Sequence, residues 1–128
     1  MHPIEQQIHR ADKAIMAEDF DTLINIYTED AVLVVKPGMN AVGRASIRKA
    51  FEAIVAYFDH SISVQQAGMI ILETGNTALV LAKTLVSASN LPVIERKATY
   101  VFNRLDSGDW LCSIDNSYGH DLLNSPDA

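Results

Sequence analysis

The sequence contains one cysteine, no excess of basic residues and no long run of apolar residues. The single Cys112 has no partner for an intrachain disulfide and lies in an apolar stretch, which favours a reducing, cytoplasmic location. No apolar run approaches the ~20 residues that a membrane-spanning helix needs. The formal net charge of -6 argues against nucleic acid as a partner, because phosphate binding requires a positive field. We therefore expect a cytoplasmic protein that binds neither nucleic acid nor membrane.

The composition is typical of a folded chain. Hydrophobic residues make up 48% of the 128 residues. A chain of this length buries roughly two-thirds of its unfolded surface, which is enough for a core without disulfides. We expect a single domain over residues 1–123, followed by a flexible polar tail over 124–128.

Apolar residues recur at spacings of three and four in the first part of the chain. Between residues 4 and 15 they define one apolar face and predict an amphipathic helix. A shorter helix is expected over 20–27, with Tyr27 on its apolar side. A third helix is expected after Gly43, because the apolar spacing resumes there and continues to residue 58.

β-branched and aromatic residues dominate the rest of the chain. A short strand is expected at 31–35, before the turn signal Lys36-Pro37-Gly38. Four longer β-rich runs are separated by residues typical of hairpin turns: 60–73, 76–88, 93–105 and 109–118. Because hairpins join antiparallel neighbours, we expect an α+β fold. Its three N-terminal helices pack on one face of a curved, mostly antiparallel sheet.

The predicted strand around residues 78–86 is apolar on both faces. The helices can cover only one face of the sheet, so something else must cover the other face. A well-covered central strand in a monomer is one explanation. We favour the other, a homodimer formed through the outer face of the sheet.

Four segments carry a resemblance to a known superfamily. They are the block Tyr-Thr-Glu-Asp-Ala-Val (27–32), Gly43-Arg44 at the third helix, Ala-Thr-Tyr-Val-Phe (98–102) and residues 108–117. In this order of elements, the chain resembles the NTF2-like superfamily, also called SnoaL-like or ketosteroid-isomerase-like, and residues 34–39 are most similar to a bacterial branch. The resemblance implies a cystatin-like α+β cone with an apolar small-molecule pocket between the helices and the sheet.

The resemblance also allows a comparison with ketosteroid isomerase, which uses an aspartate base together with a tyrosine and a protonated aspartate. The position of the base falls on Val35 or Lys36 of this sequence, that of the tyrosine on Ala11, and that of the second aspartate near Thr99. None of the three side chains is kept. Steroid isomerisation through those residues is therefore not expected.

Asp115 in the last strand is the main candidate for acid–base chemistry. The resemblance implies that Ser113, Asp115 and Ser117 face the pocket, and that Trp110 faces the interface between sheets. A carboxylate inside an apolar pocket has a raised pKa, which suits a general acid or base near neutral pH. The alternative is that Asp115 only forms hydrogen bonds with the backbone or with a partner subunit.

Two weaker acid–base candidates are Asp12 and His60. Asp12 lies on the flank of the first helix, so it faces either the pocket mouth or solvent. His60 follows Asp59 where the third helix ends, and is either an acid–base group or a local cap.

Further ligand contacts are expected from other polar side chains: Lys36, Thr99, Ser113, Ser117, Tyr27 and Tyr57. Arg96 and Lys97 lie on opposite faces of their strand, so one of them points inward or into an interface. No histidine pair has the spacing of metal ligands, and neither a metal nor another cofactor is expected.

Two functions fit this pattern almost equally well. One is proton transfer without a cofactor, of the isomerase, cyclase or dehydratase type, on a small organic ligand, and the other is non-catalytic binding of such a ligand. A domain that assembles as a dimer is the third alternative. The superfamily includes all three kinds of protein, so the fold alone does not separate them.

Overall fold

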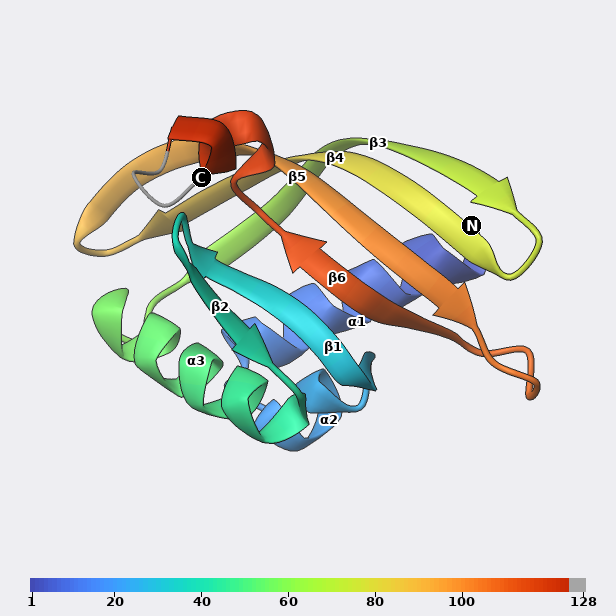
Figure 1. The fold of residues 1–128 in the computed structure, drawn as a ribbon. Coiled ribbons are helices and arrows are strands. Elements are labelled where there is room, and N and C mark those ends of the chain that lie inside the picture. The colour runs from blue at the N-terminus through green and yellow to red at the C-terminus, as the bar shows by residue number, and fades with distance from the viewer. Residues whose placement is uncertain (125–128) are drawn as a thin grey trace.

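The computed structural model describes residues 1–124 (Figure 1). Its elements in chain order are α1 (Pro3–Met16), α2 (Phe20–Ile24), β1 (Tyr27–Lys36), β2 (Met39–Val42), α3 (Arg44–Tyr57), β3 (Ser63–Thr74), β4 (Thr77–Ala88), β5 (Leu91–Arg104), β6 (Trp110–Asn116) and the 3₁₀ helix η1 (Gly119–Asn124). Asn124 of the predicted tail thus closes η1, and positions 125–128 lie outside the described residues. None of the described helices is long and apolar enough to cross a membrane.

The strands form one mixed sheet in the order β2-β1-β6-β5-β4-β3. Only β1 and β6 run parallel, and every other neighbouring pair is antiparallel. The helices lie together on one face of this sheet, where α1 contacts β6 and β3 and α3 contacts β1 and β2 (Figure 1). The expected α+β fold is confirmed.

Local sequence explains where the helices begin. Pro3 occupies the first turn of α1, and the imidazole Nδ1 of His2 accepts a hydrogen bond from the Ile4 amide. Gly43 precedes α3 with φ 87°, a conformation that L side chains rarely adopt. The two longer helices, α1 and α3, therefore begin at residues whose backbone geometry suits the start of a helix.

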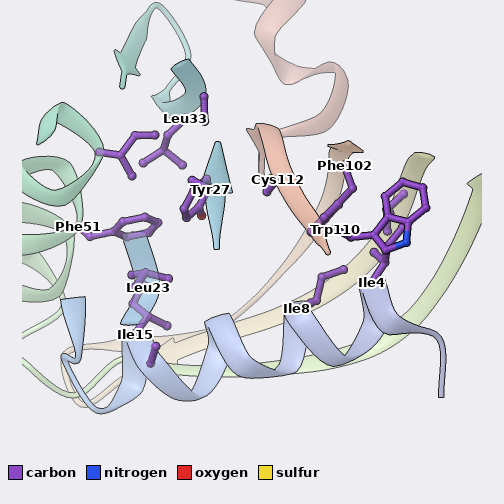
Figure 2. Packing of buried hydrophobic residues seen from close by; sticks show 14 of the residues in the cluster. Ile4, Ile8, Ile15, Leu23, Tyr27, Leu33, Phe51, Phe102, Trp110 and Cys112 are labelled. Atoms are coloured by element: carbon purple, nitrogen blue, oxygen red, sulfur yellow. The ribbon is translucent and has the colours of Figure 1, made fainter. Parts of the chain in front are cut away.

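The core lies between the helices and the inner face of the sheet (Figure 2). The largest side chains that are completely buried come from both layers: Phe102, Ile4, Leu23, Ile26, Ile47, Val55 and Val80. Burial of a large apolar side chain contributes about 1.5–3 kcal/mol, so this set supplies much of the driving force for folding.

Two elements differ from the sequence expectation. The second helix ends at Ile24, and Tyr27 instead begins β1, where it pairs in register with Cys112 of β6. Only five residues form α2, so the tertiary pairing of the aromatic Tyr27 outweighs a weak helical pattern. The four-residue strand β2 was not expected, because a strand this short has no clear alternation of its own.

Only some of the side chains of β6 face the direction that the sequence predicted. Trp110 does not face an interface between sheets: it is 4% exposed and packs in the core on the side of α1 (Figure 2). The register explains this, because Phe102 pairs with Cys112 whereas the preceding Val101 pairs with Ile114. Ser113 is thus the extra residue of a β-bulge, and the alternation of side chains reverses there.

We predict that Phe102→Ala lowers the free energy of unfolding by about 3–5 kcal/mol, because it leaves a cavity in the centre of the core. The measurement is urea denaturation followed by circular dichroism. Val101→Ala is the matched control, since Val101 is the neighbouring residue on the opposite, less buried face of β5. Its expected cost is about 1 kcal/mol, and equal losses in the two variants would contradict the assigned facing.

Candidate functional site

A cavity of about 680 Å³ lies between the helices and the sheet. That volume is typical of small-molecule sites. Most of the lining is aliphatic or aromatic, and the polar side chains in it are few: Asp12, Tyr27, Lys36, Tyr57, Thr84, Arg96, Tyr100, Asp115, Ser117 and Tyr118. The cavity is therefore a largely apolar chamber with polar groups at separate points on its wall.

Asp115 lines this cavity from β6. The bulge at Ser113 turns Asp115 to the inner face, where it pairs in register with Tyr100 of β5. The hydroxyl of Tyr27 donates a 2.5 Å hydrogen bond to Oδ2 of Asp115. Oδ1 is buried and has no hydrogen-bond partner among the described residues.

Burial has the largest effect on the pKa of Asp115. It disfavours the charged carboxylate and raises the pKa of Asp115 to about 6, although the hydrogen bond from Tyr27 acts in the opposite direction. A carboxyl group with this pKa changes protonation close to neutral pH. Asp115 is therefore able to act as an acid or as a base.

Asp12 lines the same cavity from α1. Its Oδ2 accepts a 2.9 Å hydrogen bond from the side-chain amide of Gln66. Burial raises the pKa of Asp12 to about 6, and the nearby negative charge of Asp115 adds to this rise, whereas Gln66 and His9 oppose it. The two carboxyl groups thus influence each other's protonation.

Gln66 and Thr84, on the neighbouring strands β3 and β4, support Asp12. Thr84 is only 5% exposed, and its hydroxyl donates to Oε1 of Gln66 at 3.5 Å. With its oxygen used in this way, the amide presents its NH₂ group to Asp12. The sequence analysis missed both residues. The available signal was Thr84 itself, a polar residue at an inward position of the strand whose other inward residues include Ala78, Val80, Ala82 and Val86.

Tyr100 is a further residue that the sequence analysis did not place in the site. Burial and the negative charge of Asp115 raise the pKa of Tyr100 and of Tyr27 well above the usual value. Both phenols consequently stay protonated at neutral pH and are hydrogen-bond donors. Tyr100 shares the inward face of β5 with Arg96 and Phe102, an alternation that the sequence already contains.

Of the other expected ligand contacts, Lys36, Tyr57 and Ser117 line the cavity. Thr99 does not, because it pairs in register with the exposed Leu81 on the outer face. Ser113 does not either, since it is the bulge residue and its hydroxyl donates to the carbonyl of Val101 at 3.1 Å. These two expectations are wrong.

His60 also lies away from the cavity lining. It has a φ of 52°, in the turn after α3, and its Nδ1 lies 3.0 Å from a carboxylate oxygen of Glu18. This left-handed turn directs the imidazole to the connection between α1 and α2. A catalytic role for His60 in the cavity is therefore not supported. Among residues 1–124, no group of three or more His, Cys, Asp or Glu side chains is placed to hold a metal ion.

We predict that the pH dependence of stability reports Asp115 together with Asp12. The pKa of each carboxyl group is about 6, above the ordinary value of 3.8, so the folded state binds these protons more tightly than the unfolded chain. The free energy of unfolding of the wild type should accordingly fall as pH rises from about 4 to about 6. In Asp115→Asn this fall should be smaller, by on the order of 2 kcal/mol.

Urea denaturation of both proteins between pH 3.5 and 8 measures this difference. Asp106→Asn, which changes an exposed turn carboxylate, is the control and should follow the wild type. Parallel curves for the wild type and Asp115→Asn would show that Asp115 is not a buried titrating group.

Solved structures share this fold. A protein with a cystatin-like fold from Nostoc punctiforme matches 88% of this chain and 84% of its own, at 16% identity and a TM-score of 0.77. A Catenulispora acidiphila protein in complex with S-DNPA matches 88% of this chain and 87% of its own, at 18% identity and a TM-score of 0.72. A scytalone dehydratase candidate from Novosphingobium aromaticivorans matches 88% of this chain and 78% of its own, at 18% identity and a TM-score of 0.69.

At these identities the structural likeness shows a common fold and nothing finer. No curated protein sequence matches the chain. The sequence pattern of the SnoaL-like domain, however, matches residues 4–113, which include α1 through to the bulge of β6. The chain belongs to the SnoaL-like domain family.

Proposed function

We propose that this protein is a cofactor-independent enzyme that transfers protons within a small, largely apolar organic substrate, in an isomerase, cyclase or dehydratase type of reaction. The observation that carries the proposal is the buried carboxyl group of Asp115 on the wall of the cavity, with one oxygen held by Tyr27 and the other without a partner. A carboxylate ion buried at such a position lowers the stability of the fold. Buried ionisable groups of this kind cluster at functional sites.

Asp115 acts first as the base. At neutral pH its carboxyl group is mostly ionised, since its pKa is about 6, and it takes a proton from an acidic carbon of the bound substrate. Tyr27 holds the carboxylate in place through its hydrogen bond. Tyr100, the cross-strand neighbour of Asp115, is the donor placed to stabilise negative charge that develops on a substrate oxygen.

Asp12 provides the second proton-transfer position. It faces the cavity from α1 and is held by Gln66. Because the pKa values of Asp12 and Asp115 are both about 6, the protonated fraction of Asp12 is able to deliver a proton to one atom of the substrate while ionised Asp115 removes a proton from another. Isomerisation and loss of a hydroxyl group as water both need this arrangement, because each requires proton transfer at two sites.

Membership in the SnoaL-like family and the fold shared with a scytalone dehydratase candidate support a reaction of this type. The complex of the Catenulispora acidiphila protein with S-DNPA supports small-molecule binding in this fold. The single, buried and free Cys112 is consistent with a reducing compartment, and we propose a cytoplasmic location.

The first test follows exchange of a carbon-bound proton. 2-Tetralone, an apolar ketone with acidic α-hydrogens, is incubated with the protein in D₂O, and deuterium incorporation is measured by NMR. We expect catalysed exchange by the wild type and a loss of about 10²–10⁴-fold in Asp115→Asn, the usual contribution of a positioned acid or base. The wild-type rate should rise with pH and level off above about pH 6, because the ionised carboxylate is the active form.

Asp106→Asn is the matched control, since it removes a carboxylate outside the cavity. Tyr27→Phe should shift the midpoint of the pH profile upward, because the hydrogen bond that favours the ionised form is lost. A ligand that raises the melting temperature of the wild type without any exchange would instead favour the alternative, a non-catalytic binding protein.

We also propose that the protein is a homodimer through the outer face of the sheet. Large apolar side chains are exposed on this face on the neighbouring strands β3 and β4 and on β6: Ile70, Leu72, Leu79, Leu81 and Ile114. Ile70 pairs in register with Leu81 and Leu72 with Leu79, so these residues form a continuous surface. Contiguous apolar surface of this kind marks interaction sites in soluble proteins.

Leu81→Lys tests the dimer. A charge at the centre of a dimer interface has no partner, so we expect a shift to the monomer in sedimentation velocity at micromolar concentration. Val42→Lys, which changes an exposed apolar residue of β2 at the far edge of the sheet, should leave the oligomeric state unchanged. A wild-type protein that sediments as a monomer would contradict the proposal.

A further inference from the structure

Two cationic side chains line the cavity and take no part in the proposed proton transfer. Lys36 is the last residue of β1, and Arg96 lies partly buried on the inward face of β5. All ion pairs within residues 1–124 involve other side chains. The charges of Lys36 and Arg96 are therefore not neutralised by the described part of the chain.

Tyr118 connects Arg96 to the end of β1, where Lys36 lies. The guanidinium carbon of Arg96 lies 4.6 Å from the centre of the Tyr118 ring, which is a cation–π contact. The hydroxyl of Tyr118 donates a 3.1 Å hydrogen bond to the carbonyl of Val35, the residue before Lys36. Since Tyr118 and the adjacent Ser117 also line the cavity, these contacts define one cationic end of it.

The carboxyl groups of the cavity do not serve as partners for this end. Asp12 is hydrogen-bonded to Gln66, and Asp115 is hydrogen-bonded to Tyr27. The pKa of each is raised, and the one positive charge that lowers the pKa of Asp12 comes from His9. No ion pair within residues 1–124 joins Lys36 or Arg96 to Asp12 or Asp115. The cations and the carboxylates of the cavity therefore do not neutralise each other.

We infer that the cavity takes an organic molecule with one anionic group, such as a carboxylate or sulfonate, on an otherwise apolar body. The anionic group binds at Arg96 and Lys36, with the Ser117 hydroxyl as a further donor, and the apolar body extends toward Asp115. A planar guanidinium held against an aromatic ring presents its remaining N–H groups in the fork that suits such oxyanions. The inference deepens the proposed function, because this anion would be the substrate class of the same site.

Two fluorescent probes that differ in a single group test the inference. 8-Anilinonaphthalene-1-sulfonate carries a sulfonate, and N-phenyl-1-naphthylamine has the same ring system without it. Each is titrated at pH 8 into the wild type, Arg96→Met, Lys36→Met and the double variant. We expect the wild type to prefer the sulfonate, and Arg96→Met to lose about ten-fold or more of the affinity for it, as for a charge-assisted hydrogen bond.

Lys97→Met is the matched control, because it removes the same charge from the neighbouring residue on the opposite face of β5. It should leave both affinities within about two-fold, which is the effect of an exposed charge. Binding of the neutral probe should change little in all variants, and this also shows that each variant has folded with its cavity intact. No binding of the sulfonate, equal affinity for the two probes in the wild type, or an equal loss in Lys97→Met would overturn the inference.

The failure of this inference is distinct from that of the proposed function. If the sulfonate binds selectively and its binding depends on Arg96, but the wild type catalyses no deuterium exchange, the anion site is supported and the proposed enzyme activity is contradicted. If exchange depends on Asp115 but the two probes bind equally, the enzyme activity is supported and the anion site is contradicted.

Discussion

The bulge at Ser113 is the constraint on which the site depends. A regular strand puts alternate residues on one face, so without the bulge β6 would not direct both Cys112 and Asp115 inward. With it, one strand contributes Trp110 and Cys112 to the core and Asp115 to the cavity wall. The same strand thus stabilises the fold in its first half and carries the acid in its second half.

This division explains how the protein tolerates a destabilising group. The buried cluster between the helices and the inner face of the sheet is almost entirely apolar, and Asp12 and Asp115, the carboxyl groups with raised pKa values, line the cavity. Asp115 and Asp12 nevertheless sit on opposite layers, so each raises the cost of ionising the other across the chamber. Stability lost in this way is a common feature of sites that are arranged for chemistry rather than for packing.

The order of elements was readable from the sequence because long helices and strands have strong periodicity. The spacing in α1 and α3 and the long apolar, β-branched run of β4 do not depend on tertiary contacts for their recognition. The failures occur where tertiary structure overrides local pattern. Tyr27 joins β1 because Cys112 of a distant strand pairs with it, and Trp110 faces inward because one residue is inserted after it. No pattern within either segment contains that information.

The candidate site follows the same rule. Asp115 and Asp12 were found because a carboxylate beside apolar residues is conspicuous in a sequence, whereas Gln66 and Thr84 act only through a contact between β3 and β4. Ser113 failed because it was assigned by alternation along β6, which the bulge interrupts, whereas Thr99 was assigned through the resemblance to ketosteroid isomerase and lies on the outer face of β5. The position of Arg96 in the cavity depends on its contact with Tyr118, which lies beyond the end of β6. The spacing of residues in the sequence does not reveal this contact. In this fold, single acids are visible in the sequence. The groups that orient them are brought together by the register of the strands, and register is a property of the whole sheet.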